Sequence, residues 1–387
     1  MTRHRPTFLR RIASTLAALT LGVLVSAAML EIGVRWFLGT QVRFPRRVVS
    51  APWGLRINEP HVVYRHVSPD VSVTFRINGQ GMRADRDFPV EKPPGVLRIV
   101  SLGDSFTAGY EVEAEETFSS VLEGALRARG LPVEVLNAGV SGFSTAEAYL
   151  YLERELWRYQ PDLVLLSFYV NDLVDNVRTG LFALEHGRLV PRAEGYVPAG
   201  ALGDFLNRNW LFSFLSEHSD AFALLKERAN LLVKRELVAR NLRNLEEASP
   251  GAAAPAATPS DEGEHQRALG AALLDALAET CRARGVPLVV QSIPFEQGDP
   301  PRLEDALPPG FDPSQPGVSV FFARDALAPH LGRELLYWRR SHWHWTPFSH
   351  RVAGEALAEH IAGHGLLARP AAPTEGPDRS APAAAGR

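Results

Sequence analysis

Short apolar segments recur along the chain, and each one ends at a glycine or a polar residue. They cover residues 98–102, 133–136, 163–168 and 287–292. Segments with helical periodicity lie between or beside them, at residues 115–129, 146–159 and 268–284. Such alternation predicts an α/β fold, with a buried parallel sheet and helices on both of its faces. The polar residues that follow the strands should then gather along one edge of the sheet.

Three of these strand ends carry residues suited to acyl chemistry. Ser105 follows Gly103-Asp104 after the first strand, Gly142 follows the second, and Asn171 follows the third. A serine can act as nucleophile, while a backbone N–H or a side-chain amide can stabilise an oxyanion. Each residue alone is more often a helix cap or a turn residue. Their recurrence at three successive strand ends favours a catalytic site.

The general base is expected near the end of the sequence, where three histidines precede or open a predicted helix that runs to about Ile361. They are His342, His344 and His350. The spacing could suggest a metal site, but there is no HExxH motif and no carboxylate within the cluster, which disfavours a metal. His344 lies just before Thr346-Pro347, a helix start, and is the better base candidate. His350 falls inside the helix and is expected to pack or cap.

At this point the chain resembles the SGNH/GDSL hydrolase family over about residues 70–365. The four blocks of that family are matched by Gly103-Asp104-Ser105-Phe106, Gly142, Asn171-Asp172 and His344. The resemblance implies a three-layer α/β/α, flavodoxin-like fold and hydrolysis of carboxylic esters through an acyl-enzyme.

In that family Ser105 would be the nucleophile and His344 the base. The backbone N–H groups of Ser105 and Gly142 and the amide of Asn171 would be the oxyanion donors. Three further residues are expected to support the site: Asp104, Asp172 and His342. The resemblance implies no cofactor. It leaves two alternatives to hydrolysis: acyl transfer to a polysaccharide, and an inactive domain that binds glycan.

Two departures from the family pattern are visible. An aspartate usually stands two or three residues before the catalytic histidine, but here those places hold His342 and Ser341. Asp325, Glu334 or a backbone carbonyl would have to orient His344 instead, or activity would be altered or lost. Loss of the orienting acid costs about 10⁴ in turnover in a well-studied serine protease. The second departure is Tyr169, where the third block often begins with glycine.

The amino-terminal segment predicts export. Residues 12–30 contain no charged side chain, and four arginines precede them, at positions 3, 5, 10 and 11. At 1.5 Å per residue this stretch just crosses about 30 Å of hydrocarbon. The basic flank predicts a cytoplasmic amino terminus and a periplasmic or extracellular domain. An uncleaved single-pass anchor fits better than a cleaved signal peptide, because the apolar stretch exceeds the usual core of a signal peptide.

The remaining boundaries follow from composition and pattern. We expect an anchor at residues 1–38, a β-rich lead-in at 39–95 and the hydrolase domain at 96–369. Residues 175–265 would form an insertion with a hairpin around 185–188 and a helix over 207–247, which acts as a lid or simply extends the core. Residues 249–263 and 370–387 are rich in Ala and Pro, so we expect a surface loop and a disordered tail.

Composition limits the partners. The formal net charge is −3 over 387 residues, which gives no electrostatic reason to expect a nucleic acid. A single cysteine, Cys281, excludes an internal disulfide, and we interpret it as structural. The family resemblance implies an ester substrate, such as an acylated carbohydrate or lipid, and the amino-terminal helix predicts a membrane as the other partner.

Overall fold

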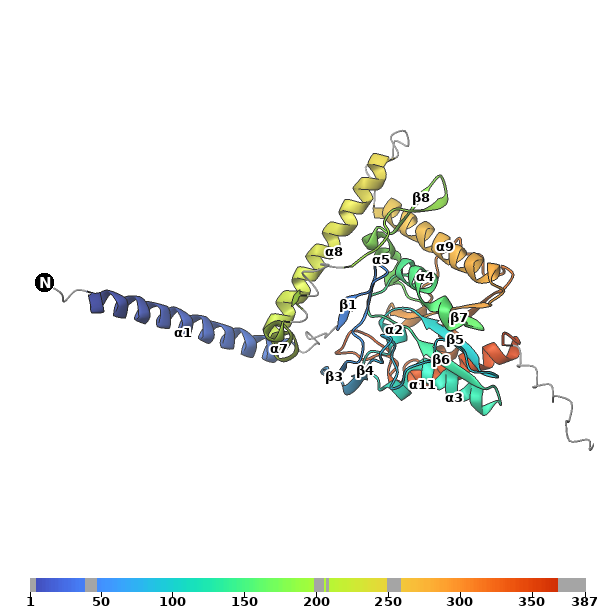
Figure 1. Ribbon diagram of the computed structural model, residues 1–387, viewed down its shortest axis with the longest axis horizontal. Helices are drawn as coiled ribbons and strands as arrows, with labels where there is room; N and C mark the ends of the chain where they lie inside the picture. The colour runs from blue at the N-terminus through green and yellow to red at the C-terminus, as the bar shows by residue number, and fades with distance from the viewer. Residues whose placement is uncertain (1–4, 39–46, 198–204, 207–208, 249–258, 368–387) are drawn as a thin grey trace, which may run out of the picture.

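A five-stranded parallel sheet forms the centre of the molecule (Figure 1). The computed structural model describes residues 5–38, 47–197, 205–206, 209–248 and 259–367. The strand order is β13-β10-β7-β5-β6, and every neighbouring pair is parallel. The strands are β5 (Leu97–Leu102), β6 (Val133–Asn137), β7 (Leu163–Phe168), β10 (Leu288–Ser292) and β13 (Val318–Phe322). The first four confirm the predicted apolar segments, whereas β13 was not predicted.

Helices cover both faces of this sheet, which confirms the predicted α/β/α architecture. One face packs against α3 (Phe118–Ala128) and α11 (Pro347–Gly363). The other packs against α4 (Thr145–Arg154), α5 (Asn171–Thr179) and α9 (Pro259–Ala283). Side chains alternate along a strand, so successive residues pack into the cores on opposite faces of the sheet. Ile99 and Val100 of β5 are an example.

The strand order places a switch point beside β5. The chain passes from β5 to β6 on one side, and then to β7 on the other side of β5. Connections that leave in opposite directions open a crevice at the carboxyl ends of the strands, where open α/β sheets bind their ligands. The residues that follow β5, β6 and β7 therefore meet at one place.

The lead-in is β-rich, as predicted. It contains two antiparallel pairs, β1 (Val48–Ser50) with β2 (Arg56–Asn58), and β3 (Val63–Val67) with β4 (Ser72–Arg76). The second pair buries Tyr64 and Phe75 against Tyr110, a residue of the main domain. The lead-in thus packs directly beside the segment that follows the predicted nucleophile.

Several predicted helices have different limits. The segment 115–129 divides into the short 3₁₀ helix η1 (Ala114–Glu116) and α3, and the segment 146–159 divides into α4 and η2 (Leu156–Tyr159). The segment 207–247 divides at Ser219 into α7 (Trp210–His218) and α8 (Asp220–Ala248). Helix α9 begins at Pro259, so part of the predicted 249–263 loop is helical, while residues 249–258 and the predicted 370–387 tail lie outside the described residues.

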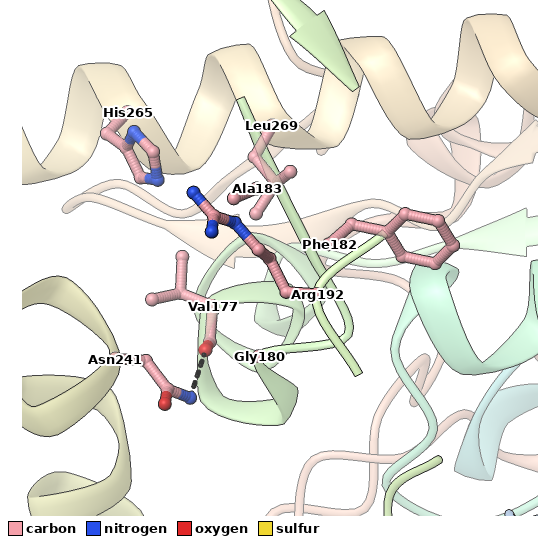
Figure 2. A pocket seen from close by; sticks show the side chains of 8 residues that line it. All are labelled: Val177, Gly180, Phe182, Ala183, Arg192, Asn241, His265 and Leu269. Atoms are coloured by element: carbon pink, nitrogen blue, oxygen red, sulfur yellow. Dashed lines mark hydrogen bonds between the residues drawn. The ribbon is translucent and has the colours of Figure 1, made fainter. Parts of the chain in front are cut away.

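The insertion forms a helical layer on α5, with the predicted hairpin present as β8 (Phe182–Glu185) and β9 (Arg188–Pro191). A cavity of about 240 Å³ lies within it (Figure 2), and Arg192, Asn241 and His265 are its polar side chains. The Asn241 amide donates to the carbonyl oxygens of Val177 and Arg178, each at 3.0 Å. None of the predicted site residues lines this cavity.

Two smaller units complete the domain. A short antiparallel pair, β11 (Phe295–Gln297) with β12 (Arg302–Glu304), follows β10. After β13 come α10 (Ala323–Leu327) and the 3₁₀ helix η3 (Ala328–His330), which lead to the segment before α11. Cys281 is buried in α9 as a free thiol, consistent with a structural role.

The amino-terminal helix α1 (Arg5–Phe37) extends away from the globular part (Figure 1). Residues Arg10–Phe37 are long and apolar enough to cross a membrane, with a mean hydropathy of 2.0 in the most apolar window. This window is not buried by the rest of the chain, unlike the core helix of a soluble protein. The helix is compatible with the predicted single-pass anchor.

Candidate active site

The turn after β5 presents Ser105 at the carboxyl edge of the sheet. Gly103 has φ +148°, and a Cβ there would lie 2.3 Å from Thr107 Oγ1, so the turn requires glycine. Asp104 is the N-cap of α2 (Ser105–Ala108), and its side chain accepts from the Phe106 N–H at 2.9 Å. The capping role therefore belongs to Asp104, and the hydroxyl of Ser105 is available for another partner.

That partner is His344. Its Nε2 lies 2.8 Å from Ser105 Oγ, a normal hydrogen-bond distance for a serine and its base. The His344 side chain is 6% exposed and its ring packs against Phe106 and Tyr110. These two residues are 239 positions apart in the sequence, and the structure brings them together as the sequence analysis predicted.

A small hairpin carries His344. Tyr337 and Trp345 form an antiparallel bridge, and the Trp338 N–H donates to the His344 carbonyl at 2.9 Å. The hairpin tip is tied to the lead-in, because Asp70 Oδ2 accepts from the Arg340 N–H and from the Ser341 hydroxyl, both at 2.9 Å. The backbone that presents the base is therefore fixed from two sides.

The carboxylate that faces His344 is Glu111, which the sequence analysis did not identify. Its Oε2 lies 3.6 Å from His344 Nδ1, on the side of the ring opposite Ser105. The sequence analysis expected Asp325, Glu334 or a backbone carbonyl to orient His344. That expectation is wrong, because the carboxylate that faces His344 Nδ1 is that of Glu111. Glu111 lies six residues after Ser105 and reaches the ring because the chain turns sharply there, with Glu111 at φ +69°. No local sequence pattern predicts such a turn.

Glu111 is charged despite its burial. The side chain has no exposed surface, and burial alone would raise its pKa. Hydrogen bonds and charge interactions with His344 and His66 outweigh that cost and lower the pKa of Glu111 to about 2. The site therefore holds an anion beside the imidazole at all ordinary pH values.

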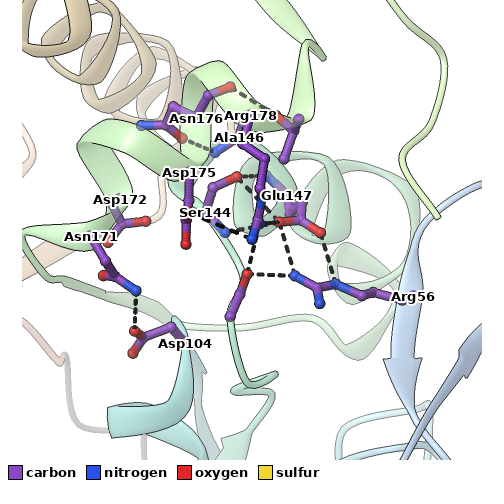
Figure 3. Close-up of polar contacts among 12 residues, drawn as sticks. Arg56, Asp104, Ser144, Ala146, Glu147, Asn171, Asp172, Asp175, Asn176 and Arg178 are labelled. Atoms are coloured by element: carbon purple, nitrogen blue, oxygen red, sulfur yellow. Dashed lines mark hydrogen bonds and ion pairs between the residues drawn. The ribbon is translucent and has the colours of Figure 1, made fainter. Parts of the chain in front are cut away.

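The turn after β6 orients Gly142. Gly142 has φ +73°, and its carbonyl accepts from Arg56 Nη2 and, at 3.0 Å, from Arg178 Nη2. Glu147 lies between the two arginines and pairs with both (Figure 3). The ion pairs hold the two arginines in place, and their hydrogen bonds fix the direction of the Gly142 carbonyl and hence the peptide plane between Gly142 and Phe143. Arg56 comes from β2 of the lead-in, and sequence reasoning missed it.

Asn171, the first residue of α5, lies beside the nucleophile turn. Its Nδ2 donates to Asp104 Oδ2 at 3.2 Å, which leaves a second amide N–H for another acceptor. Asp172 points away from Ser105: it accepts from the Tyr169 N–H at 2.9 Å and from the Thr145 hydroxyl at 3.1 Å. Asp172 thus supports the β7–α5 turn, as expected for a supporting residue.

The other two histidines of the cluster have different environments. His350 is buried in α11, and its Nδ1 accepts from the Phe118 N–H at 3.1 Å. Burial lowers the pKa of His350 to about 3, so this ring is neutral and packs, as predicted. His342 is exposed, with its ring centroid 6.5 Å from that of His344. It lies next to the site but not between the catalytic candidates.

Comparisons with known proteins agree with the family resemblance. The family model described as "GDSL-like Lipase/Acylhydrolase family" matches residues 101–320. An arylesterase of Vibrio mimicus is 37% identical over 75 residues, which cover 19% of this chain and 38% of that protein. The chain therefore aligns with less than half of that relative's length.

Solved structures of low identity are also similar. A two-domain esterase active on acetylated mannans is 12% identical, with a TM-score of 0.39, and the match covers 73% of this chain and 52% of that one. A psychrotrophic esterase from Pseudoalteromonas sp. is 14% identical, with a TM-score of 0.34, over 69% of this chain and 97% of that one.

Proposed function

The chain belongs to the GDSL-like lipase/acylhydrolase family, and on this premise we propose that it is a carboxylic ester hydrolase with Ser105 as nucleophile. One observation carries the proposal: Ser105 Oγ and His344 Nε2 are 2.8 Å apart at the switch point of the sheet. A serine with its base at hydrogen-bond distance, and a third group behind the base, is the arrangement that nucleophilic acyl chemistry requires.

In the first half of the reaction Ser105 Oγ attacks the ester carbonyl while His344 Nε2 accepts the hydroxyl proton. The carbonyl oxygen becomes an oxyanion, which accepts hydrogen bonds from the N–H groups of Ser105 and Gly142 and from Asn171 Nδ2. The intermediate then collapses to an acyl-enzyme, and the leaving alcohol takes the proton from His344. In the second half a water molecule repeats these steps and releases the acid.

Glu111 is the orienting acid in this proposal. Its carboxylate faces His344 Nδ1, so it favours the tautomer with a proton on Nδ1 and a basic Nε2, and it stabilises the imidazolium that forms. The case for an inactive, glycan-binding domain rested on the missing aspartate before His344. Glu111 supplies the same function from another segment of the chain, which favours hydrolysis over that alternative.

We place this activity outside the cytoplasm, with α1 as a single-pass membrane anchor. The four arginines before residue 12 and the exposed, apolar surface of the helix support this orientation. For the substrate we propose an acyl ester of a carbohydrate. Trp343 directly precedes His344, is 46% exposed and has φ +57°, a backbone conformation that is unusual for a bulky residue. The exposed part of this ring, whose centroid lies 4.7 Å from the Arg339 guanidinium carbon, offers a flat surface for a sugar ring.

The test uses the full chain in detergent, with p-nitrophenyl acetate as substrate and a fluorophosphonate probe. We expect hydrolysis and labelling by the wild type, and neither by Ser105→Ala. Ser120→Ala is the matched control. Ser120 is an exposed serine of α3, so this variant should retain both hydrolysis and labelling. Wild-type protein that is neither active nor labelled would refute the hydrolase. Faster ester consumption when a sugar acceptor is added, with the acyl group found on the sugar, would identify acyl transfer instead.

A further inference from the structure

The lead-in hairpin places a buried histidine beside the site. Along β3 the side chains alternate, so that Tyr64 and His66 point inward while Val63, Arg65 and Val67 are exposed. The His66 side chain has no exposed surface, and its ring packs edge-on against Tyr110, with centroids 5.5 Å apart. A fully buried histidine on a short hairpin needs a polar partner within the protein.

His66 shares Glu111 with His344. His66 Nε2 lies 3.5 Å from Glu111 Oε1, while the other carboxylate oxygen, Oε2, lies 3.6 Å from His344 Nδ1. One carboxylate thus bridges two imidazoles, and all three side chains are at most 6% exposed. The order of contacts runs from His66 through Glu111 and His344 to Ser105.

We propose that His66 is a positioning residue for the ester hydrolysis proposed above, and that it acts through Glu111. The Glu111 carboxylate can rotate about its Cγ–Cδ bond. A hydrogen bond donated by His66 to Oε1 restricts this rotation and so fixes the direction in which Oε2 faces His344. Without His66, a buried carboxylate oxygen would lose its donor, which costs about 1–3 kcal/mol unless the side chain moves. The β-rich lead-in is then part of the catalytic apparatus rather than a cover for the core.

The surroundings of His66 assign this role to Glu111 rather than to another charge. The ionisable side chains around His66 and its partners include Glu111 and Tyr110 from the turn after α2, Tyr64 from β3 itself, and His344. Tyr64 and Tyr110 have their hydroxyls 3.5 Å apart. Of these groups, Glu111 is the one that can carry a negative charge at neutral pH.

The test compares His66→Leu with His66→Gln, whose amide can donate from nearly the position of Nε2. For His66→Leu we expect a fall in kcat of about 10- to 100-fold, the range seen for the outer partners of metal-bound histidines, with KM unchanged. The acid limb of kcat/KM should move to lower pH, because the imidazolium of His344 loses part of its stabilisation. His66→Gln should recover most of the loss. Arg65→Gln, on the outer face of β3, is the matched control.

The position of the Nδ1 proton of His344 provides a readout besides turnover. In a proton NMR spectrum of the full chain, this proton should give a downfield signal in the wild type and His66→Gln that moves or vanishes in His66→Leu. If wild-type protein lacks esterase activity but shows this pattern, the proposed function fails and the positioning role stands. If His66→Leu folds and keeps the wild-type kcat, pH profile and signal, the positioning role is refuted. His66→Gln that folds but restores neither kcat nor the signal also refutes it.

A separate observation concerns the junction of α1, α7 and α8. The Glu31 side chain, from α1, accepts from the backbone N–H groups of Asp220 and Ala221, each at 3.0 Å, and so caps α8. Arg35 donates to the His218 carbonyl at 3.0 Å. The last turns of α1 are therefore joined to the point where α7 ends and α8 begins, close together in Figure 1.

Large apolar side chains are exposed at this junction. Trp36 and Phe37 of α1 are 83% and 87% exposed, and Trp210 and Phe214 of α7 are 75% and 50% exposed. We define these four residues as the junction patch. Residues 12–30 span about 28 Å as a helix, so the hydrocarbon boundary falls near Glu31, at the level of the junction. Exposed Trp and Phe at that level suit the headgroup region of a bilayer.

We infer that α7 lies on the surface of the membrane that α1 spans, with Trp210 and Phe214 among the lipid headgroups. This inference rests on the proposed anchor. The occupant is lipid rather than a second protein, because Trp36 and Phe37 follow the apolar segment of α1 within about two helical turns, and α7 ends where Arg35 of α1 contacts it. The globular domain would then be held close to the bilayer instead of moving freely at the end of a tether.

The test places a bimane label on single cysteines of the full chain in nanodiscs that contain brominated lipid, with Cys281→Ala as background. Labels at Trp210→Cys and Phe214→Cys should be quenched, and a label at Leu232→Cys should not. Leu232 is 67% exposed but lies farther along α8, so it is the matched control. A label at Leu21→Cys tests the span itself. Quenching at position 21 without quenching at 210 and 214 would refute the surface contact alone, and no quenching at 21 would refute the span. Protection from iodide at 210 and 214 that depends on protein concentration would instead identify a second copy and refute the lipid contact.

Discussion

Replacing Glu111 by glutamine removes the charge behind His344 while it preserves the shape of the side chain. Glu111→Gln should lower kcat, because the imidazolium formed during attack by Ser105 loses its counter-charge. The Gln amide can also donate to His344 Nδ1, which would favour the wrong tautomer of the ring. Both effects act in the transition state, so KM should change little.

The structure sets the scale of this loss. A unit charge 3.6 Å away contributes at most about 5 kcal/mol at an effective dielectric constant of about 20, which is about 10³ in rate. The fall in the Glu111 pKa from 4.5 to about 2 corresponds to about 3 kcal/mol in total. This value is net of the desolvation cost, so half of it, about 1–2 kcal/mol or about 10-fold, is a lower bound for the part due to His344. We therefore expect a loss of kcat between about 10- and 10³-fold.

The assay is the pH dependence of p-nitrophenyl acetate hydrolysis by full-length protein. The acid limb of kcat/KM should move to lower pH in Glu111→Gln, since protonated His344 is less stabilised. Glu115 is an exposed carboxylate of the neighbouring η1, so Glu115→Gln should match the wild type. A Glu111→Gln protein that folds with wild-type kcat and an unmoved acid limb would refute the assignment of Glu111.

The same carboxylate makes a prediction about stability. The pKa of Glu111 is lower in the folded protein than its ordinary value of 4.5, so its contribution to the free energy of unfolding is fully present above about pH 4.5 and is lost as the pH falls towards 2. The difference in this free energy between wild type and Glu111→Gln should narrow over that range in urea titrations. A difference that is constant from pH 6 to pH 2.5 would contradict a charged, paired Glu111.

Three further changes have expected outcomes. Asn171→Ala should lower kcat by about 10²–10³ in steady-state assays with little change in KM, and an unchanged kcat would remove Asn171 from the oxyanion site. Arg56→Met should lower kcat by about 10-fold in the same assay, because the Gly142 carbonyl keeps only its hydrogen bond from Arg178. A change in KM with no change in kcat would contradict this prediction. Gly103→Ala should destabilise the protein by about 2–3 kcal/mol in thermal or urea unfolding, because the new Cβ would lie 2.3 Å from Thr107 Oγ1, and an unchanged midpoint would contradict the required glycine turn.

Local sequence was sufficient to predict the sheet and the turn that carries the candidate nucleophile. The strand β5 is an uninterrupted apolar run that ends in Gly103-Asp104-Ser105, and β6 and β7 repeat the pattern with Gly142 and Asn171. Each of these assignments depends on residues that are close together in the chain. The position of His344 followed in turn from the family resemblance and its helix start.

Glu111 and His66 could not be found in this way, because their roles depend on packing between distant segments. Glu111 lies beyond a short helix in a turn with positive φ, and His66 reaches it from a separate hairpin. The break at Ser219 is similar, since the α8 cap is supplied by Glu31, 189 residues earlier. Strand β13 is apolar at four of its five positions, but no helix separates it from β10, so the alternation of strands and helices that predicted the sheet does not extend to it.

The link between Asp70 and the hairpin that carries His344 joins residues 271 positions apart. The segments around β5, β6 and β7 can associate early in folding, because their contacts are comparatively local. The contacts that orient His344 have to wait until the first and last parts of the domain meet. Catalytic competence should therefore appear after the sheet has formed, as one of the last events in the folding of the chain.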